Sequence, residues 1–163
     1  MRNNQPVTMI ETLIPEGEFI YSRTDLKGVI EEANEAFAAS SGYTREEMIG
    51  QPHNMVRHPD MPEAAFADLW TDLKAGRPWR GLVKNRRKDG GYYWVVANAS
   101  PGREEGRTVG YQSVRARPTR QEIAAAEEAY RRIRQGDHSL RIRHGRVERV
   151  LPRVVNWFAS LPT

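Results

Sequence analysis

The sequence contains no cysteine among its 163 residues. This absence excludes disulfide bonds, thiolate nucleophiles, iron–sulfur clusters and cysteine-based zinc sites. No apolar run approaches the roughly 18 residues of a membrane-spanning helix, and the polar residues 1–5 lead into no signal peptide. The nucleophile elbow, the phosphate-binding loop, the dinucleotide-binding glycine pattern and the zinc-protease helix are also missing. Nothing in the sequence argues for a hydrolase or a kinase, and we expect the protein not to be an enzyme.

The chain has no marked excess of positive or negative charge before its C-terminal part. The net charge is +4, yet residues 1–116 carry 15 basic and 16 acidic side chains, whereas residues 117–163 carry 10 arginines and 5 acidic side chains. A basic tail suits an acidic partner, an anionic membrane surface or nucleic acid, and it can equally be a solvated helix face. Nucleic acid is disfavoured because no recognition-helix motif accompanies the charge.

The chain divides into three parts by its pattern. Residues 1–17, broken by two prolines, are expected to form an N-terminal arm, and residues 18–117 a folded domain. Residues 118–163 open with a capping box at Thr119, which predicts a helix to about Arg134, followed by a basic amphipathic tail that links to an output domain or partner. Elements expected in the central part are strands at 19–21, 29–30, 79–86, 92–100 and 109–115, and helices at 34–40, from 44, and at 62–76. This order predicts an α+β fold, with short helices on one face of a five-stranded antiparallel sheet.

A run of polar side chains lies between two of the expected helices and is punctuated by prolines. It comprises Gln51, His53, Asn54, Arg57, His58 and Asp60. An irregular segment with this density of recognition groups commonly holds a ligand. Simpler roles remain open: Asp60 would serve as a helix N-cap, Arg57 as a surface ion pair, and the histidines as solvent-facing residues.

Alternation along the strand at 79–86 predicts which side chains face inward. Trp79, Val83 and Asn85 share one face, and the charged side chains of the other face are expected in water. The same reasoning on the last strand places Gln112 inward. Because buried amides need hydrogen-bond partners, we expect these two amides to meet the edge of a heteroaromatic ring.

Several motifs of this chain resemble those of PAS domains. They are Asp25-Leu26-Lys27-Gly28, Ala33-Asn34-Glu35-Ala36-Phe37, Ser41-Gly42-Tyr43-Thr44 and Lys88-Asp89-Gly90. The segment from Gly50 to Pro62, together with Lys84-Asn85-Arg86-Arg87-Lys88, is similar to the signature of the aerotaxis-receptor subgroup. The resemblance covers residues 25–115 directly and extends loosely into the helix that follows.

The resemblance implies a flavin module that holds FAD and reports redox or oxygen state; FMN fits less well. It assigns Asn34, Trp79 and Asn85 to the flavin lining, and Arg57, His58 and Asp60 to a cofactor-dependent segment. His53 falls near the position of the reactive cysteine of light-sensing flavin domains. Gln112 falls at the position where those domains carry a glutamine against the isoalloxazine ring. Without that cysteine, adduct photochemistry is excluded. An inward amide that rotates as the ring gains charge would pass the signal to the sheet, and Arg57 would pair with the diphosphate.

Two other readings of a PAS domain remain open from the sequence. One is a haem-binding gas sensor with His53 or His58 as the axial ligand. The other is a cofactor-free module that dimerises through the N-terminal arm and the Thr119 helix, and such a homodimer is compatible with the flavin reading too.

The resemblance also implies the partners of a signalling domain. Expected partners are a chemoreceptor-type signalling or HAMP domain and, through the basic residues 141–153, an anionic membrane surface. The expected location is cytoplasmic, with contact to the inner membrane face through this tail or through an anchor beyond the C-terminus.

Overall fold

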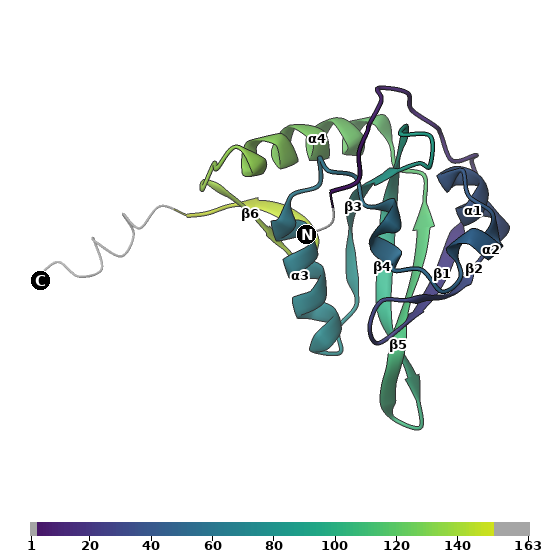
Figure 1. Ribbon diagram of the computed structural model, residues 1–163. Helices are drawn as coiled ribbons and strands as arrows, with labels where there is room; N and C mark the ends of the chain where they lie inside the picture. Colours follow the sequence, from purple (N-terminus) through teal and green to yellow (C-terminus); the bar gives the residue numbers. More distant parts are fainter. Residues whose placement is uncertain (1–2, 152–163) are drawn as a thin grey trace, which may run out of the picture.

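The computed structural model describes residues 3–151 of the chain (Figure 1). Within them, the strands are β1 (Ile20–Asp25), β2 (Ile30–Ala33), β3 (Trp79–Arg86), β4 (Tyr92–Glu104), β5 (Arg107–Ala116), β6 (Leu140–Arg143) and β7 (Arg146–Arg149). The helices are α1 (Glu35–Ser41), α2 (Arg45–Met48), the 3₁₀ helix η1 (His53–Val56), α3 (Glu63–Lys74) and α4 (Arg120–Arg134). None of these helices is long and apolar enough to cross a membrane.

The first five strands form one antiparallel sheet in the order β2-β1-β5-β4-β3. This confirms the predicted α+β fold. The tight connection between β3 and β4 follows from its turn residues, because Asp89 Oδ1 accepts the Gly91 N–H at 2.9 Å and Gly90 has φ +94°. Two neighbouring long strands, β4 and β5, extend past the domain edge as a ribbon that is visible at the bottom of Figure 1.

Local capping signals fix where most of the helices begin. Thr44 and Thr119 each form the predicted capping box, with the glutamate three positions further on. Asn34 caps α1, because its Oδ1 accepts the Phe37 N–H at 3.0 Å. Helix α3 differs: the residue before it is Pro62 and no side chain caps it, so the expectation that Asp60 serves as its N-cap is wrong.

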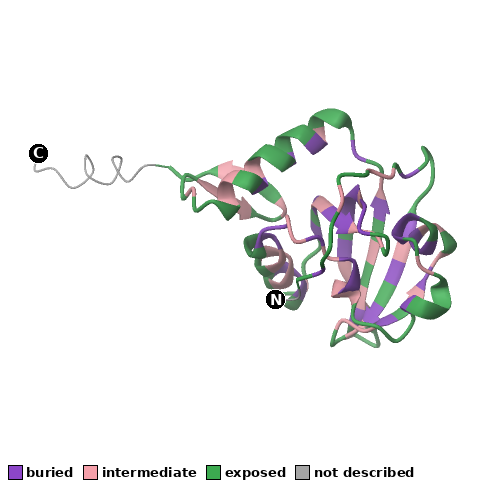
Figure 2. Ribbon diagram, turned by 45° about the horizontal axis from the view of Figure 1, so that its top comes forward, coloured by how far each residue is buried: buried purple, intermediate pink, exposed green. Residues whose placement is uncertain are grey.

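Each face of the sheet carries its own hydrophobic core. On one face, Phe37, Met48 and Val56 from the helical segments pack against Tyr93 and Val95 of β4. On the other face, α4 packs through Ile123, Ala126 and Tyr130 against Trp94. Figure 2 shows buried residues along the sheet strands and mostly exposed ones along α4. The predicted short helices therefore cover one face of the sheet, and the predicted C-terminal helix, to which the sequence analysis assigned no position, covers the other.

Helix α4 changes the environment of the charged face of β3. Lys84, predicted to lie in water, is 5% exposed. Its Nζ lies 2.8 Å from Asp60 Oδ2 and 4.4 Å from the centroid of the Tyr92 ring. The prediction is wrong for Lys84 because a helix distant in sequence covers this part of the strand, while Arg80 is exposed as expected.

A hairpin of β6 and β7 follows α4, in the part of the chain where the sequence analysis expected a basic amphipathic tail and assigned no strands. Its turn residues His144 and Gly145 both have positive φ, 53° and 81°, as a type I′ turn requires. Figure 1 shows the hairpin beside α3. The amphipathic run 154–158 and Arg153 lie outside the described residues.

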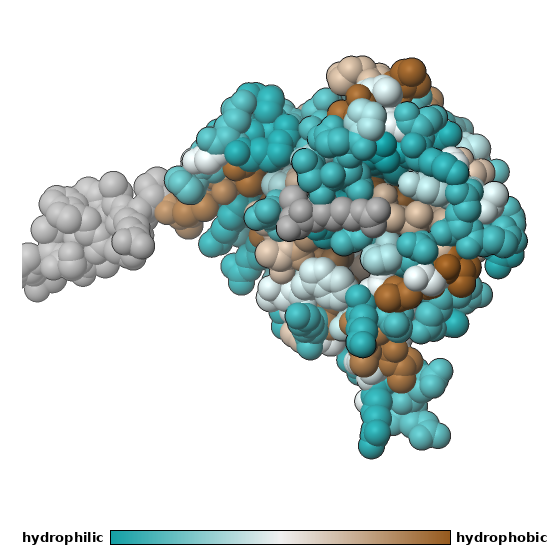
Figure 3. All heavy atoms as spheres, viewed as in Figure 1, coloured by the Kyte–Doolittle hydropathy of each residue, from teal (hydrophilic) through white to brown (hydrophobic). Residues whose placement is uncertain are grey.

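The N-terminal arm lies along the start of β4. Thr8 N–H donates to Gly90 O at 2.8 Å, and Tyr92 N–H donates to Ile10 O at 3.0 Å. Two hydrophobic side chains of the arm are largely exposed, Met9 at 85% and Ile10 at 70%. Figure 3 shows a hydrophobic patch at the top of the molecule. The division of the chain at residues 17 and 117 stays a prediction.

Candidate functional site

A cavity of about 250 Å³ lies between the helical segments and the inner face of the sheet. Its volume is slightly below the roughly 300–1,000 Å³ of typical ligand pockets. The segment Pro52–Arg57 and helix α3 form its walls, and residues of β1, β3, β4 and β5 form its floor. Five of the eight residues that the sequence analysis assigned to a cofactor line it, namely His53, Arg57, Trp79, Asn85 and Gln112.

A buried polar cluster occupies one end of the cavity. Arg115 is 3% exposed, and its guanidinium donates to Ser22 Oγ at 2.8 Å and lies 3.1 Å from His53 Nε2. Because a guanidinium only donates, His53 Nε2 accepts here, which requires a neutral imidazole. Burial and then the charge of Arg115 lower the pKa of His53 to about 3, in agreement with this geometry. Phe37 stacks on the His53 ring at 5.5 Å and holds it in place.

Arg115 is a buried cation with no carboxylate partner in the described part of the chain. Burial lowers the pKa of Arg115 to about 10, and its Nε makes no hydrogen bond to any described residue. A desolvated charge of this kind is costly unless it is compensated. An acceptor-rich or anionic ligand in the cavity would supply that compensation.

Arg57 and Asn85 face one another across the cavity wall. Their backbones form an isolated antiparallel bridge, which brings the polar segment against β3. The Arg57 guanidinium lies 3.8 Å from the centroid of the Phe66 ring, and its buried Nε also has no partner among the described residues. Asn85 is buried and lies opposite Tyr93 in the pairing of β3 with β4, which places its amide at the floor of the cavity.

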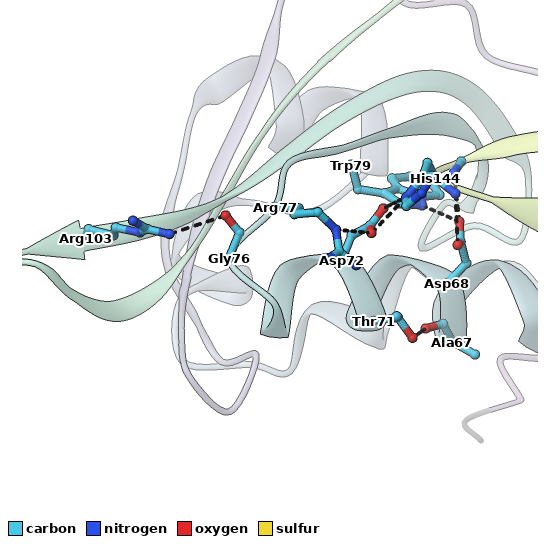
Figure 4. A network of polar contacts seen from close by, with 10 residues as sticks. Ala67, Asp68, Thr71, Asp72, Gly76, Arg77, Trp79, Arg103 and His144 are labelled. Atoms are coloured by element: carbon cyan, nitrogen blue, oxygen red, sulfur yellow. Dashed lines mark hydrogen bonds and ion pairs between the residues drawn. The ribbon is translucent and has the colours of Figure 1, made fainter.

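Trp79 contributes a flat wall to the cavity. A Cβ at Gly81 would lie 2.4 Å from the Trp79 ring, so the indole lies across a position that only glycine permits. Its Nε1 donates to Asp68 Oδ2 at 2.7 Å (Figure 4). The indole is thus fixed by packing on one side and by a carboxylate at its edge.

Three of the predicted site residues do not line the cavity. The amide of Asn34 is used within the fold, because it also accepts from Tyr21 N–H and donates to Phe19 O. His58 is buried beside Tyr92, and its Nδ1 accepts the Asp60 N–H at 3.0 Å. Burial and then the charge of Lys84 lower the pKa of His58 to about 4. Asp60 binds Lys84 of β3 through its carboxylate and Arg134 of α4 through its carbonyl oxygen. His58 and Asp60 therefore belong to the contact between β3 and α4, which we call the junction beneath α4.

Gln112 borders the cavity, but the expectation that its amide faces inward beside Asn85 is wrong. The side chain is exposed and donates to Ser100 Oγ at 3.4 Å. The residues of β5 that face the cavity are the alternate ones, Ser113 and Arg115. Because Val114 is apolar, the sequence analysis assigned its face of the strand to the interior, although Val114 is 41% exposed. Only the clustering of Ser22, Ser113 and Arg115 on paired strands could have shown which face is inward.

The lining of the cavity fits a planar heteroaromatic ring that carries anionic groups. Among the described residues, the lining includes the cations Lys27, Arg57 and Arg115 but no carboxylate. The apolar walls suit the faces of such a ring. The Asn85 amide at the floor and the two unpartnered guanidinium nitrogens suit the hydrogen-bonding edge of a flavin. The geometry favours haem less, because His53 Nε2 already contacts Ser22 and Arg115 and His58 points into the α4 junction.

Comparison with known proteins places this architecture in a family. The family model for the PAS fold matches residues 30–115. The aerotaxis receptor of Escherichia coli strain K12 is 49% identical over all 163 residues, which make up 31% of that receptor. The chain therefore spans about a third of the length of this relative.

Solved structures agree with the match. A PAS domain from Colwellia psychrerythraea has a TM-score of 0.57 and 27% identity, over 62% of this chain and 86% of that one. A light-oxygen-voltage domain studied with a flavin analogue has a TM-score of 0.59, over 68% of this chain and 83% of that one, but its 23% identity shows the fold alone. The family model spans more than half of the chain, and the sheet, the helices and the cavity agree with it. The chain belongs to the PAS family, and over its whole length its sequence is similar to part of an aerotaxis receptor.

Proposed function

We propose that this chain is a flavin-binding sensory module that holds FAD, reports redox or oxygen state, and passes a conformational change to a chemotaxis-type output. One observation carries the proposal: the lining of the cavity, among the described residues, contains no carboxylate but includes a buried arginine, Arg115, whose Nε has no hydrogen-bond partner. The similarity to an aerotaxis receptor and to a flavin-binding type of PAS domain supports the same ligand class.

The residues of the cavity would divide the ligand between them. Arg115 would bind an electron-rich edge of the ring, while Trp79 and Val83 supply apolar contact to its faces. Arg57 and Lys27 would meet phosphate oxygens, because a guanidinium matches them in a bidentate way. A bound flavin supplies reversible electron uptake, with growing negative charge on its ring.

Asn85 is the residue best placed to report a change of charge in the cavity. Its amide offers a donor on one side and an acceptor on the other, and Asn85 lies opposite Tyr93 of β4. Growing negative charge favours the donor side, so the amide would reorient toward the ligand. The signal would therefore begin as an altered hydrogen bond on β3. No step in this mechanism requires catalysis by the protein.

The partners of the module are part of the proposal. The similarity to a receptor favours a chemoreceptor-type or HAMP signalling domain as the recipient. A cytoplasmic location follows from such a role. The exposed hydrophobic side chains of the N-terminal arm favour a homodimer, and the basic C-terminal part favours contact with an anionic membrane surface.

An absorbance spectrum of the purified protein tests the proposed cofactor. We expect the two visible bands of oxidised flavin, and acid release with chromatography should identify FAD rather than FMN. Asn85→Asp should weaken binding by adding a negative charge to the cavity, whereas Glu128→Gln on the outer surface of α4 should not. A Soret band would support haem instead. A colourless protein that also refuses added FAD would overturn the flavin proposal in favour of a cofactor-free module.

A further inference from the structure

The β6–β7 hairpin is attached to the domain through its turn. A Cβ at Gly145 would lie 1.8 Å from Arg80 O, so the turn touches the backbone of β3 directly. Its backbone N–H groups point at helix α3, where His144 N–H donates to Asp68 Oδ1 at 3.0 Å and Gly145 N–H donates to Asp68 Oδ2 at 2.7 Å. One carboxylate therefore grips two successive amides of the turn.

The same carboxylate holds the wall of the cavity. Asp68 Oδ2 accepts the Trp79 indole N–H at 2.7 Å, and Figure 4 shows Trp79 and His144 together at Asp68. Trp79 borders the cavity on one side and the groove beneath the hairpin on the other. The indole and the hairpin turn therefore share one acceptor, Asp68 Oδ2.

A second carboxylate reinforces the attachment. Asp72 lies four positions after Asp68 on α3, so both side chains project from the same face of the helix. Asp72 is buried, and it contacts His144 Nδ1 at 2.9 Å and Arg77 Nε at 3.0 Å. Although burial opposes ionisation, the bonds from His144 and Arg77 lower the pKa of Asp72. The histidine side chain thus anchors the turn beside the two amides that Asp68 binds.

We propose that Asp68 is a positioning residue that couples the cavity to the β6–β7 hairpin: it ties the Trp79 indole to the hairpin turn, so a ligand that fixes the indole also fixes how the hairpin docks. The hairpin is the last described element before the chain continues toward its C-terminus. A change in its docking moves Val150 and Leu151, the described residues that follow it. The inference rests on the proposed function for the nature of the ligand, while the link between Trp79 and the hairpin is a property of the protein itself.

Hydrogen exchange in the whole chain tests this link without any ligand. Asp68→Asn keeps the shape of the side chain but replaces one accepting oxygen with an NH₂ group. That group cannot accept the hydrogen bonds that the hairpin turn and the indole donate to Asp68. Exchange of residues 140–149 should become about tenfold faster, as expected for losing hydrogen bonds to a charged acceptor, while β4 and β5 stay protected. Glu63→Gln in the first turn of the same helix is the matched control and should leave the hairpin unchanged. Equal exchange in Asp68→Asn and wild type would overturn the proposal.

Two further variants approach the link from either end. Trp79→Phe keeps an aromatic wall but removes the indole N–H, and it should alter hairpin exchange by about threefold although Trp79 is outside the hairpin. Gly145→Ala forces the turn away from Arg80 O and should speed exchange as much as Asp68→Asn. If Gly145→Ala loosens the hairpin but Trp79→Phe has no effect on it, the hairpin is merely docked and the coupling is refuted.

Added FAD separates coupling from simple docking. In wild type, exchange of residues 140–149 should differ by at least about threefold between the FAD-loaded and the FAD-free protein. In Asp68→Asn this difference should disappear while FAD still binds. A persistent difference in the variant, or none in wild type, would refute the coupling. If wild type binds no FAD, the proposed function fails, and the Trp79→Phe and Asp68→Asn results alone decide the inference.

Discussion

The two faces of the sheet both bury cationic side chains, but only one of them pairs the charge. Beneath α4, Lys84 binds Asp60 at 2.8 Å. On the cavity face, the partners of Arg115 among the described residues are neutral: Ser22, His53 and the ring of Phe37. A paired buried charge holds segments of the fold together, whereas an unpaired one leaves binding free energy for a ligand. The paired charge of Lys84 therefore marks a structural junction, and the unpaired charge of Arg115 marks a binding site.

Arg115→Met should break this comparison with the largest effect. Flavin affinity should fall about 10- to 150-fold, which corresponds to the roughly 1.5–3 kcal/mol of a hydrogen bond to a charged group. The ligand-free protein should be as stable as wild type or more so, because the substitution removes a desolvated charge. Flavin titration and urea denaturation measure the two quantities.

The matched control for Arg115 is Arg107→Met, an exposed cation on the same strand. It should change neither quantity. A loss of stability in Arg115→Met as large as its loss of affinity would show that Arg115 supports the fold rather than the ligand.

Lys84→Met should show the opposite pattern. Removing the ammonium leaves the Asp60 carboxylate without its main partner, and the free energy of unfolding should fall by about 1–3 kcal/mol. Affinity for flavin should stay within about twofold in the folded protein, since Lys84 does not line the cavity. Urea denaturation and flavin titration again supply both numbers, with the exposed Lys88→Met as the control. A selective loss of flavin binding with normal stability would place this junction in the binding site.

The sequence predicted what short-range signals determine. The capping boxes at Thr44 and Thr119 and the turn at Asp89 depend on neighbouring residues, and the structure contains all three. Side-chain orientation was harder to predict, because it depends on what covers each face. Lys84 is buried by a helix far along the chain, and the inward phase of β5 is set by Arg115 and its partners on distant segments.

The hairpin escaped prediction for a related physical reason. Its strands have four residues each, and its His144–Gly145 turn lacks the usual Asn-Gly or Asp-Gly signal. The turn is held by carboxylates of α3, in particular by Asp68, which lies 76 positions before His144. The site segment was predicted better, since the resemblance located His53 and Arg57, but it could not show that His58 and Asp60 face α4.

The stability of the protein should depend on pH through the cavity histidine. The pKa of His53 is lowered to about 3 in the folded state, so the unfolded chain binds the proton first as the pH falls below about 6.5. The free energy of unfolding should therefore decrease below that pH, by up to about 1.4 kcal/mol per unit from this group. Urea denaturation of the flavin-free protein from pH 7 to pH 5 should show a shallower decline in His53→Gln.

His58, whose pKa is lowered to about 4, adds to the decline from the other face, so His53→Gln should reduce the slope without abolishing it. Exposed His138→Gln is the control. An unchanged slope in His53→Gln would mean that the imidazole is protonated in the folded cavity, which is incompatible with the bond it accepts from Arg115.

The smallest effect should come from a neutral bond beneath α4. The Tyr130 hydroxyl donates to Leu82 O at 2.7 Å and fastens the helix to β3. Tyr130→Phe keeps the ring that stacks near Trp94 but leaves this carbonyl without the bond, so the free energy of unfolding should fall by about 1 kcal/mol. Flavin affinity should equal that of wild type, because the tie lies on the face opposite the cavity; Tyr21→Phe on β1 serves as the control in the same denaturation series. A change in flavin affinity in Tyr130→Phe would mean that the two faces of the sheet are coupled through β3. The pairing of buried charges would then not be enough to distinguish the junction beneath α4 from the cavity.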